Sequence, residues 1–372
     1  FFFNDTATKE IYIFSLHDAL PIFGHKELNY KIIKSLKKYH DLIVIDYKNY
    51  YRDIYSMKNV KFLDIRKLYF PKRVTVLKRL CSCINFLKVL FMLRSEKFDV
   101  AFLTSYDSFS FSSLYKFIEK YHIYILHHNN LDMIKTWKEI IRFNKYKDYV
   151  SHVVLSEYIK DGLVDKHGIN HNSIHVVRCP LFSDYTLKKE TFKLESNNNN
   201  NMFVSLGLGS DEEIINEIIS FDKNTGYFEN TNYKLIVRSS IYNYERGNLR
   251  IFKGFLSSKE YYNYYLNCSA YILLYPSTFE NRFSASLLNA LQYGKHVIST
   301  DIKVARYYKD LFPNSISIIN GMLDLIEIIE NYKMQFDENE YIRIINYFSD
   351  SNFEEDLRQT FCNQFVKRKL YK

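Results

Sequence analysis

Apolar residues along this chain fall into short runs, separated by longer stretches in which apolar residues recur at helical spacing. The short runs that we predict as strands lie at 42–46, 60–65, 98–103, 122–126, 152–155, 175–177, 203–207, 234–237, 249–252, 271–275 and 296–299. Alternation of buried strands with amphipathic helices is typical of parallel sheets built from βαβ units. The pattern therefore predicts an α/β fold with two similar halves that face one another.

The boundary between these halves is predicted near residue 180. A chain of 372 residues is too long for one ordinary core and favours two domains. The first half ends on a strand that leads to Cys179 and Pro180, and the asparagine run Asn197–Asn201 is typical of a linker or surface loop. We expect an N-terminal domain at 23–180 and a C-terminal domain at 181–372.

The first 22 residues are treated separately, as a non-native segment. The stretch Asn4–Ile22 resembles the peptide obtained by translating a sequencing adapter, with matches at Asn4–Thr8 and at Ser15–Ile22. We therefore expect the protein proper to begin near Phe23, with its first strand missing. The alternative is that residues 10–14, EIYIF, form a genuine N-terminal strand.

The charge balance is basic, with 51 Lys and Arg against 42 Asp and Glu, a formal net charge of +9. Residues 1–22 contain one lysine and three carboxylates, a net −2, so the remainder carries +11. A basic chain suits nucleotide phosphates, anionic lipid or nucleic acid. Its five scattered cysteines are typical of reduced thiols in a cytoplasmic protein, and no run of about 20 uncharged apolar residues predicts a membrane-spanning helix.

Polar residues follow two predicted strands of the first half. Thr104 and Ser105 end one strand, and His127 and His128 end the next. Ligands of doubly wound sheets bind beyond the carboxyl ends of the strands. Either histidine can orient a hydroxyl or relay a proton near neutral pH. The alternative for each is a strand-end histidine hydrogen-bonded to backbone.

The stretch Tyr275–Asp301 reads as a strand, a polar loop, an amphipathic helix at about residues 285–293, a glycine stop and another strand. Ser284 or Ser286 can cap the helix, and the amides of its first turn form a positive pole suited to a diphosphate. Arg282 adds positive charge beside that pole. Without further information, an ordinary capped strand-loop-helix unit explains the same pattern equally well.

This stretch resembles the donor-binding signature of family 4 and related GT-B glycosyltransferases, in which Pro-Ser, Glu-x-Phe-Gly, Glu-Ala, Gly and Pro-Val-Ile follow one another. The matching places here are Pro276-Ser277, Asn281-Arg282-Phe283-Ser284, Asn289-Ala290, Gly294 and His296-Val297-Ile298. The resemblance implies a GT-B fold, in which two Rossmann-like domains face one another across a cleft, and a nucleotide diphosphate sugar as the donor.

Asparagines stand where this family has its two glutamates. The resemblance implies that Asn281 lies near the donor sugar and that Asn289 bonds the ribose hydroxyls, since an amide both donates and accepts. Asn281 supplies no negative charge, and the adjacent Glu280 is the alternative source of one. The family also places a histidine facing the donor sugar, which corresponds to His127 or His128.

The family often carries basic residues after the first strand of its second domain, but the loop 207–212 has none here. Arg238, at the end of the next strand, is a possible replacement. The residues implied for catalysis are His127, His128, Glu280 and Asn281. Those implied for donor binding are Arg238, Arg282, Phe283, Ser284, Ala285, Ser286 and Asn289.

The resulting functional prediction is metal-independent, cofactor-free transfer of a sugar to a glycan or lipid-linked acceptor, in bacterial surface polysaccharide synthesis. No Asp-x-Asp follows a predicted strand, and no nucleic-acid-binding motif accompanies the charge. The alternative is a catalytically inactive GT-B binding or partner module. The basic apolar stretch Pro71–Lys97 adds a choice between peripheral contact with an anionic membrane, at the inner face of the plasma membrane, and packing on the first sheet.

Overall fold

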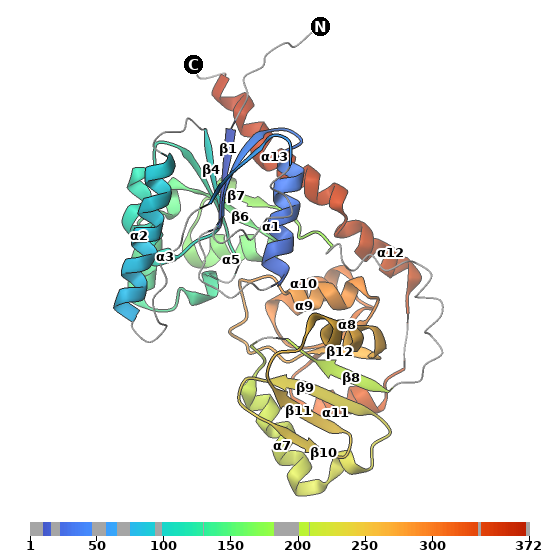
Figure 1. The fold of residues 1–372 in the computed structure, drawn as a ribbon. Coiled ribbons are helices and arrows are strands. Elements are labelled where there is room, and N and C mark those ends of the chain that lie inside the picture. The colour runs from blue at the N-terminus through green and yellow to red at the C-terminus, as the bar shows by residue number, and fades with distance from the viewer. Residues whose placement is uncertain are drawn as a thin grey trace. The chain divides into compact units, whose positions relative to one another are not determined.

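The computed structural model describes residues 10–15, 23–46, 57–64, 75–93, 99–128, 130–181, 201–207, 209–333 and 336–369 (Figure 1). The chain separates into two compact units. The first unit comprises Phe1–Pro180 together with Asp350–Lys372, and the second comprises Leu181–Ser349. Each unit is built on its own seven-stranded sheet.

The sheet of the first unit has the order β3-β2-β1-β4-β5-β6-β7, with every pairing parallel. Its strands are β1 (Glu10–Ser15), β2 (Asp41–Asp46), β3 (Val60–Asp64), β4 (Val100–Ser105), β5 (His122–Leu126), β6 (Ser151–Val154) and β7 (Ile174–Val176). The strand order reverses between β1 and β4, as in a doubly wound sheet. β4 is buried along its whole length, so it forms the centre of this core.

The central strand of this sheet departs from the sequence-based expectation. We expected the protein proper to begin near Phe23 with its first strand missing, but Glu10–Ser15 form β1, which pairs with β2 on one side and β4 on the other. The genuine-strand alternative is therefore the one that this fold uses, because β1 joins the two halves of the sheet. The resemblance of residues 4–22 to a translated adapter stays a prediction about the origin of the sequence.

Helices lie on either side of the first sheet (Figure 1). They are α1 (Phe23–Leu36), α2 (Thr75–Leu93), α3 (Ser108–Leu114), α4 (Trp137–Asn144), α5 (Glu157–His167) and the C-terminal α13 (Asp350–Lys369). Helix α1 packs against α13, whereas α2 packs on α3 and α3 on α4. Right-handed crossovers place helices on opposite faces according to the direction in which the chain moves across the sheet.

Helix α13 belongs to the first unit, which corrects the expected domain range 181–372. Its Asp356 accepts two hydrogen bonds from the Arg178 guanidinium, at 2.7 Å from Nε and 2.6 Å from Nη2. The ring of Phe361 lies 5.0 Å from that of Phe102 and 4.7 Å from that of Tyr124. These contacts join residues that are far apart in the sequence. The local hydrophobic pattern does not show them, so the last helix was predicted as part of the C-terminal domain.

The sheet of the second unit has the order β10-β11-β9-β8-β12-β13-β14. Its strands are β8 (Met202–Ser205), β9 (Lys234–Ser239), β10 (Tyr244–Arg246), β11 (Leu249–Lys253), β12 (Ala270–Leu273), β13 (His296–Thr300) and β14 (Ile316–Ile319). Only β10 runs antiparallel to its neighbour among these pairings. The strand order reverses between β8 and β12, so a ligand is expected beyond the carboxyl ends of these two strands.

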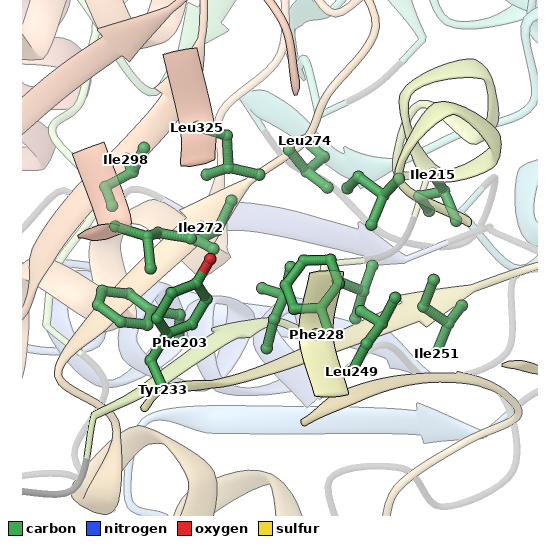
Figure 2. Packing of buried hydrophobic residues seen from close by; sticks show 14 of the residues in the cluster. Phe203, Ile215, Phe228, Tyr233, Leu249, Ile251, Ile272, Leu274, Ile298 and Leu325 are labelled. Carbon is green, nitrogen blue, oxygen red and sulfur yellow. The ribbon is translucent and has the colours of Figure 1, made fainter. Parts of the chain in front are cut away.

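The helices of the second unit are α7 (Glu212–Thr225), α8 (Ser258–Asn267), α9 (Ala285–Gln292), α10 (Lys303–Leu311), α11 (Met322–Glu330) and α12 (Glu338–Tyr347). Figure 2 shows one layer of the core, in which Phe203 and Ile272 of neighbouring strands lie with Ile298, Ile215 and Leu325. This packing fixes the strand ends from which the candidate site is built. No helix within the described ranges has the length and apolar character needed to cross a membrane.

Candidate functional site

The first turn of α9 begins at a serine cap. Ser284 has an extended backbone, and its Oγ accepts a hydrogen bond from Leu287 N at 3.1 Å. Of the two serines that the sequence offered, Ser284 is therefore the cap, whereas Ser286 Oγ lies 3.4 Å from Tyr261 Oη. The first amides of a helix have no partner within the helix and carry its positive pole. This end of α9 is therefore suited to an anion.

An aromatic stack supports the loop that leads into α9. The ring of Tyr275, just after β12, lies parallel to that of Phe279 with centroids 4.2 Å apart. The guanidinium of Arg282 lies 4.2 Å from the Phe279 centroid, a cation–π contact. The stack holds a positive charge in the residues that immediately precede the helix. Arg282 was predicted from the sequence, but the two rings were not, because the stack depends on how the loop folds back.

The loop after β8 touches the same stack. A Cβ atom on Gly207 would lie 3.0 Å from Tyr275 Oη and 3.1 Å from Cε1, closer than most Cβ contacts in proteins. Only glycine fits without a shift, so the β8 loop and the β12 loop meet at the point where the strand order reverses. The sequence showed Gly207 as part of a weak Gly-x-Gly fingerprint. Its role in the structure is close backbone approach to Tyr275.

The two asparagines in the family's acidic positions are both buried. Asn281 is 4% exposed and Asn289 is 8% exposed, whereas Glu280 is partly exposed. Asn289 Oδ1 is shielded from solvent and has no hydrogen-bond partner among the described residues. An unsatisfied buried acceptor costs about 1–3 kcal/mol. Asn289 therefore offers an acceptor in the second turn of α9 that the protein leaves unused.

The remaining predicted donor-site residues lie around the same helix end. Phe283 packs edge-on against Tyr308, with ring centroids 6.4 Å apart, which anchors the last part of the loop in the core. Ala285 opens α9 and is partly exposed. The end of the loop and the first two residues of α9 thus contain five consecutive predicted donor-site residues, Arg282–Ser286.

Arg238 supplies a second positive charge, at the end of β9. Its guanidinium lies 4.7 Å from the centroid of Phe255, an aromatic side chain that is 79% exposed. Burial lowers the pKa of Arg238 from its usual value, an effect that Tyr261 and Tyr271 partly oppose. No carboxylate of the described residues forms an ion pair with it. Sequence analysis missed Phe255, which follows Gly254 in an ordinary loop pattern.

The two candidate histidines of the first unit have different surroundings. His127 is fully buried and part of a hydrogen-bonded chain. His152 Nε2 lies 2.9 Å from Lys147 O and must donate, so His152 Nδ1 accepts from His127 Nε2 at 2.8 Å. His127 Nδ1 then accepts from Asn130 Nδ2 at 2.9 Å. Both rings are neutral in this arrangement.

Electrostatics keep this chain neutral. Burial, followed by the neighbouring His152, moves the pKa of His127 well below its usual value. Burial lowers the pKa of His152 to about 4. His127 has both ring nitrogens engaged inside the unit, which supports a structural role and gives it no exposed surface for a sugar.

His128 is the partly exposed member of the pair. Its Nε2 lies 2.9 Å from Thr104 O, to which it donates. Its backbone N–H donates to Asn130 Oδ1 at 3.2 Å. Asn130 therefore holds both histidines at the end of β5, and sequence analysis missed it because its role depends on this folded loop. The two histidines belong to the first unit, and the remaining predicted site residues belong to the second.

Within the described ranges, no cluster of His, Cys, Asp or Glu side chains has the arrangement of a metal site. Among the described residues, the α9 amides and the two arginines are groups that can hold an anion.

Comparison with known proteins finds similarity in structure only. No family model and no curated protein sequence matches the chain. HepE from Anabaena, solved with UDP and glucose, is similar with a TM-score of 0.66 and 12% identity over 95% of this chain and 100% of that chain. A glycosyltransferase from Rickettsia africae has a TM-score of 0.60 and 13% identity over 98% and 99%.

The same fold also carries a different chemistry. A UDP-GlcNAc 2-epimerase from Methanocaldococcus jannaschii is similar with a TM-score of 0.52 and 14% identity over 98% of this chain and 100% of that chain. At such identities the comparisons establish the fold and leave the activity to the site. The chain has the GT-B fold, with two Rossmann-like domains.

Proposed function

We propose that this chain is a glycosyltransferase that takes its sugar from a nucleotide diphosphate sugar. The observation that carries the proposal is the meeting of Gly207, the Tyr275–Phe279–Arg282 stack and the start of α9 where the strand order reverses. A diphosphate needs concentrated positive charge on a surface without large side chains. The α9 amides and Arg282 provide the charge, and the close approach of Gly207 to Tyr275 brings the β8 loop beside them.

In this proposal the rest of the donor binds on either side of the diphosphate. Asn289 Oδ1, which has no partner among the described residues, accepts a hydrogen bond from a ribose hydroxyl after a small side-chain shift. Arg238 with Phe255 offers a cation and an exposed ring at the end of β9 and β11. These groups can engage a nucleoside by hydrogen bonding and stacking.

The chemical step that we propose needs no metal ion. Arg282 and the α9 amides stabilise the negative charge that develops on the diphosphate as the bond to the sugar breaks. Glu280 is the carboxylate next to Asn281 and is partly exposed, so it is the group that can oppose positive charge on the sugar. His128, rather than the buried His127, is the histidine that can orient a hydroxyl.

We further propose a glycan or lipid-linked acceptor and a role in bacterial surface polysaccharide synthesis, at the cytoplasmic side of the membrane. The support for this finer assignment is the resemblance of the sequence 275–301 to family 4 signatures and the basic net charge of +9. No cofactor and no nucleic acid enters the proposal.

A second candidate function is a catalytically inactive binding module. Replacement of both family glutamates by the buried Asn281 and Asn289 favours it, since neither amide carries charge. The two candidates differ in whether the donor is consumed.

The test is release of nucleotide from a panel of UDP, GDP, ADP and CMP sugars, with and without glycan acceptors. The glycosyltransferase proposal predicts release from one donor class, and Arg282→Gln abolishes most of it by removing the charge beside α9. Arg250→Gln is the matched control, because Arg250 also lies over a ring, Phe252, at 5.7 Å. Saturable binding without release establishes the inactive module, and conversion of the donor sugar without release indicates an epimerase.

A further inference from the structure

A tyrosine of α8 contacts the first turn of α9. Tyr261 Oη lies 3.4 Å from Ser286 Oγ and 3.3 Å from the hydroxyl of Tyr265, which stands about one helical turn further along α8. Tyr265 Oη in turn lies 3.2 Å from the backbone oxygen of Ser286, the second residue of α9. These hydrogen bonds form a closed ring that begins and ends at Ser286, which we call the hydroxyl circuit.

The direction of each hydrogen bond in the hydroxyl circuit follows from the number of hydrogens. A carbonyl oxygen only accepts, so Tyr265 donates its single hydroxyl hydrogen to Ser286 O. Tyr265 Oη must then accept from Tyr261, and Tyr261 Oη must accept from Ser286 Oγ. Burial raises the pKa of Tyr265 well above its usual value, so its hydroxyl keeps this hydrogen at neutral pH. The one hydrogen of the Ser286 hydroxyl is therefore donated toward α8.

The hydroxyl circuit determines what Ser286 can offer to a ligand. Ser286 is partly exposed, and because its hydrogen is already used, its oxygen presents lone pairs that accept hydrogen bonds. The ionised oxygens of a diphosphate also only accept, so they are unsuitable partners. A hydroxyl group of a ligand, by contrast, can donate to Ser286 Oγ.

Asn289 supplies a second acceptor on the same face of α9. It lies three residues after Ser286, a spacing that makes two side chains neighbours on a helix. Asn289 is 8% exposed, and its Oδ1 has no hydrogen-bond partner among the described residues. Two neighbouring acceptors suit hydroxyl groups of a ligand, whereas the backbone amides at the start of α9 suit phosphate.

The hydroxyl circuit lies beside other groups of the proposed donor site. Burial lowers the pKa of Arg238, and Tyr261 opposes this effect. Burial raises the pKa of Tyr275, and the hydroxyls of Ser284 and Ser286 oppose that effect. Both effects require proximity, so the circuit is close to Arg238 and to the aromatic stack before α9.

We propose that Ser286 accepts a hydrogen bond from a hydroxyl group of the donor, and that Tyr261 is a positioning residue that keeps Ser286 Oγ turned to accept it. The hydroxyl belongs to the ribose or to the transferred sugar, which share this chemistry. The inference rests on the proposed function, because it assigns roles within the same donor site. It gives Ser286 a hydroxyl as its partner, although the start of a helix by itself suggests phosphate.

Titration calorimetry of the full chain separates these partners. The ligands are UDP-, GDP- and ADP-glucose, the free nucleoside diphosphates, the 2′-deoxy and 3′-deoxy forms of both, and inorganic pyrophosphate. We expect Ser286→Ala to weaken binding about fivefold for every ligand that carries the hydroxyl, since one uncharged hydrogen bond contributes about that factor. Ligands without this hydroxyl, pyrophosphate included, should bind the parent and Ser286→Ala equally.

The pattern of losses identifies the source of the hydroxyl. A loss confined to the glucose-bearing ligands assigns it to the transferred sugar. A loss that disappears in the 2′-deoxy or the 3′-deoxy ligands assigns it to that position of the ribose. Either pattern supports the inference.

Tyr261→Phe tests the positioning role, because it removes one oxygen and keeps the ring. We expect it to weaken binding of the same ligands about threefold, since the freed Ser286 hydroxyl no longer has a fixed direction. Combined with Ser286→Ala, it should weaken binding no further, because Tyr261 acts only through Ser286. Additive losses would overturn the role of Tyr261. The controls are Tyr264→Phe on the same helix and Ser220→Ala, at an exposed serine of α7, which should bind every ligand as the parent does.

Two results overturn the inference and leave the proposed function standing. One is an equal loss of affinity for all ligands in Ser286→Ala, pyrophosphate included, which would make Ser286 a phosphate ligand. The other is parental affinity of Ser286→Ala for every ligand. If the folded parent binds none of the nucleotide ligands, the donor site itself is contradicted, and this inference falls with it.

Discussion

At the residue scale, the candidate site depends on contacts between residues that the local sequence does not show. Gly207 is required by the Tyr275 ring beside it, and Arg282 is held by Phe279. His127 is a neutral link between His152 and Asn130. The residue types in the loop before α9 could be read from the sequence. Their contacts could not, because these depend on how the loop folds back and on Gly207, which is distant along the chain.

The Gly207 contact predicts a steric effect. Gly207→Ala should destabilise the second unit by about 1–3 kcal/mol, as overpacking does, and should weaken nucleotide binding by displacing Tyr275. Denaturant unfolding and nucleotide titration measure the two effects. Combining it with Tyr275→Ala should cost less than the sum of the single changes, since the clash is gone. Full additivity would contradict the contact.

The histidine chain predicts acid sensitivity of the first unit. His152 has a folded pKa of about 4, below the usual value near 6.5, so the unfolded state binds the proton more readily. The contribution of neutral His152 to the free energy of unfolding is therefore complete above pH 6.5. It is lost as the pH falls from 6.5 through 4. The full effect is about 3 kcal/mol.

Unfolding in denaturant as a function of pH tests the upper part of this range, about pH 6.5 to 5, in which ordinary carboxylates remain mostly ionised. His152→Gln should flatten the slope between pH 6.5 and 5, whatever it costs in absolute stability. His171→Gln, at an exposed histidine, is the control and should leave the slope unchanged. An identical slope for parent and His152→Gln would show that the chain is not kept neutral.

At the element scale, the helix that carries the proposed diphosphate site was the best predicted part of the chain. The sequence placed this helix at about residues 285–293, and α9 spans Ala285–Gln292, with Gly294 at φ 63° beyond its end. Apolar periodicity, a capping residue and a terminal glycine all agree here. By contrast, β10 and β14 were missed, because short edge strands gain their stability from pairing rather than from a strong apolar run.

The cap predicts a separation of stability from binding. Ser284→Ala should cost about 1 kcal/mol by removing the hydrogen bond to Leu287 N. It should also weaken diphosphate binding, because the first turn frays. Thr136→Ala removes the corresponding cap of α4 and should cost a similar amount with unchanged nucleotide affinity. Equal affinity in parent and Ser284→Ala would argue against a phosphate at α9.

At the scale of the whole molecule, the alternation of strands and helices predicted two Rossmann-like domains, and the GT-B fold is confirmed. The return of α13 to the first unit could not be predicted, since its contacts join residues far apart in the sequence. The salt bridge of Arg178 with Asp356 closes one of these long-range links. The first unit is thus a discontinuous domain.

This discontinuity predicts that α13 is needed by the first unit. Asp356→Asn should destabilise that unit by about 2 kcal/mol, since a charged hydrogen-bond pair is lost, and Phe361→Ala should cost about 3–5 kcal/mol. Arg358→Ala, an exposed change on the same helix, should be nearly neutral. Urea unfolding and limited proteolysis compare the three. Equal stability of all three variants would mean that α13 does not stabilise the first unit.

The most direct test of a donor site at α9 is a titration of the full chain with UDP, GDP, ADP and CMP sugars. The measured quantity is the thermal stability of the chain. We expect one nucleotide to stabilise the parent by about 2.7 kcal/mol at a concentration of 100 times Kd. Arg282→Ala and Asn289→Ala should lose this stabilisation, and Arg250→Ala should keep it. Stabilisation by none of the four in a folded sample would contradict a donor site at α9. Equal stabilisation of all variants would contradict it as well.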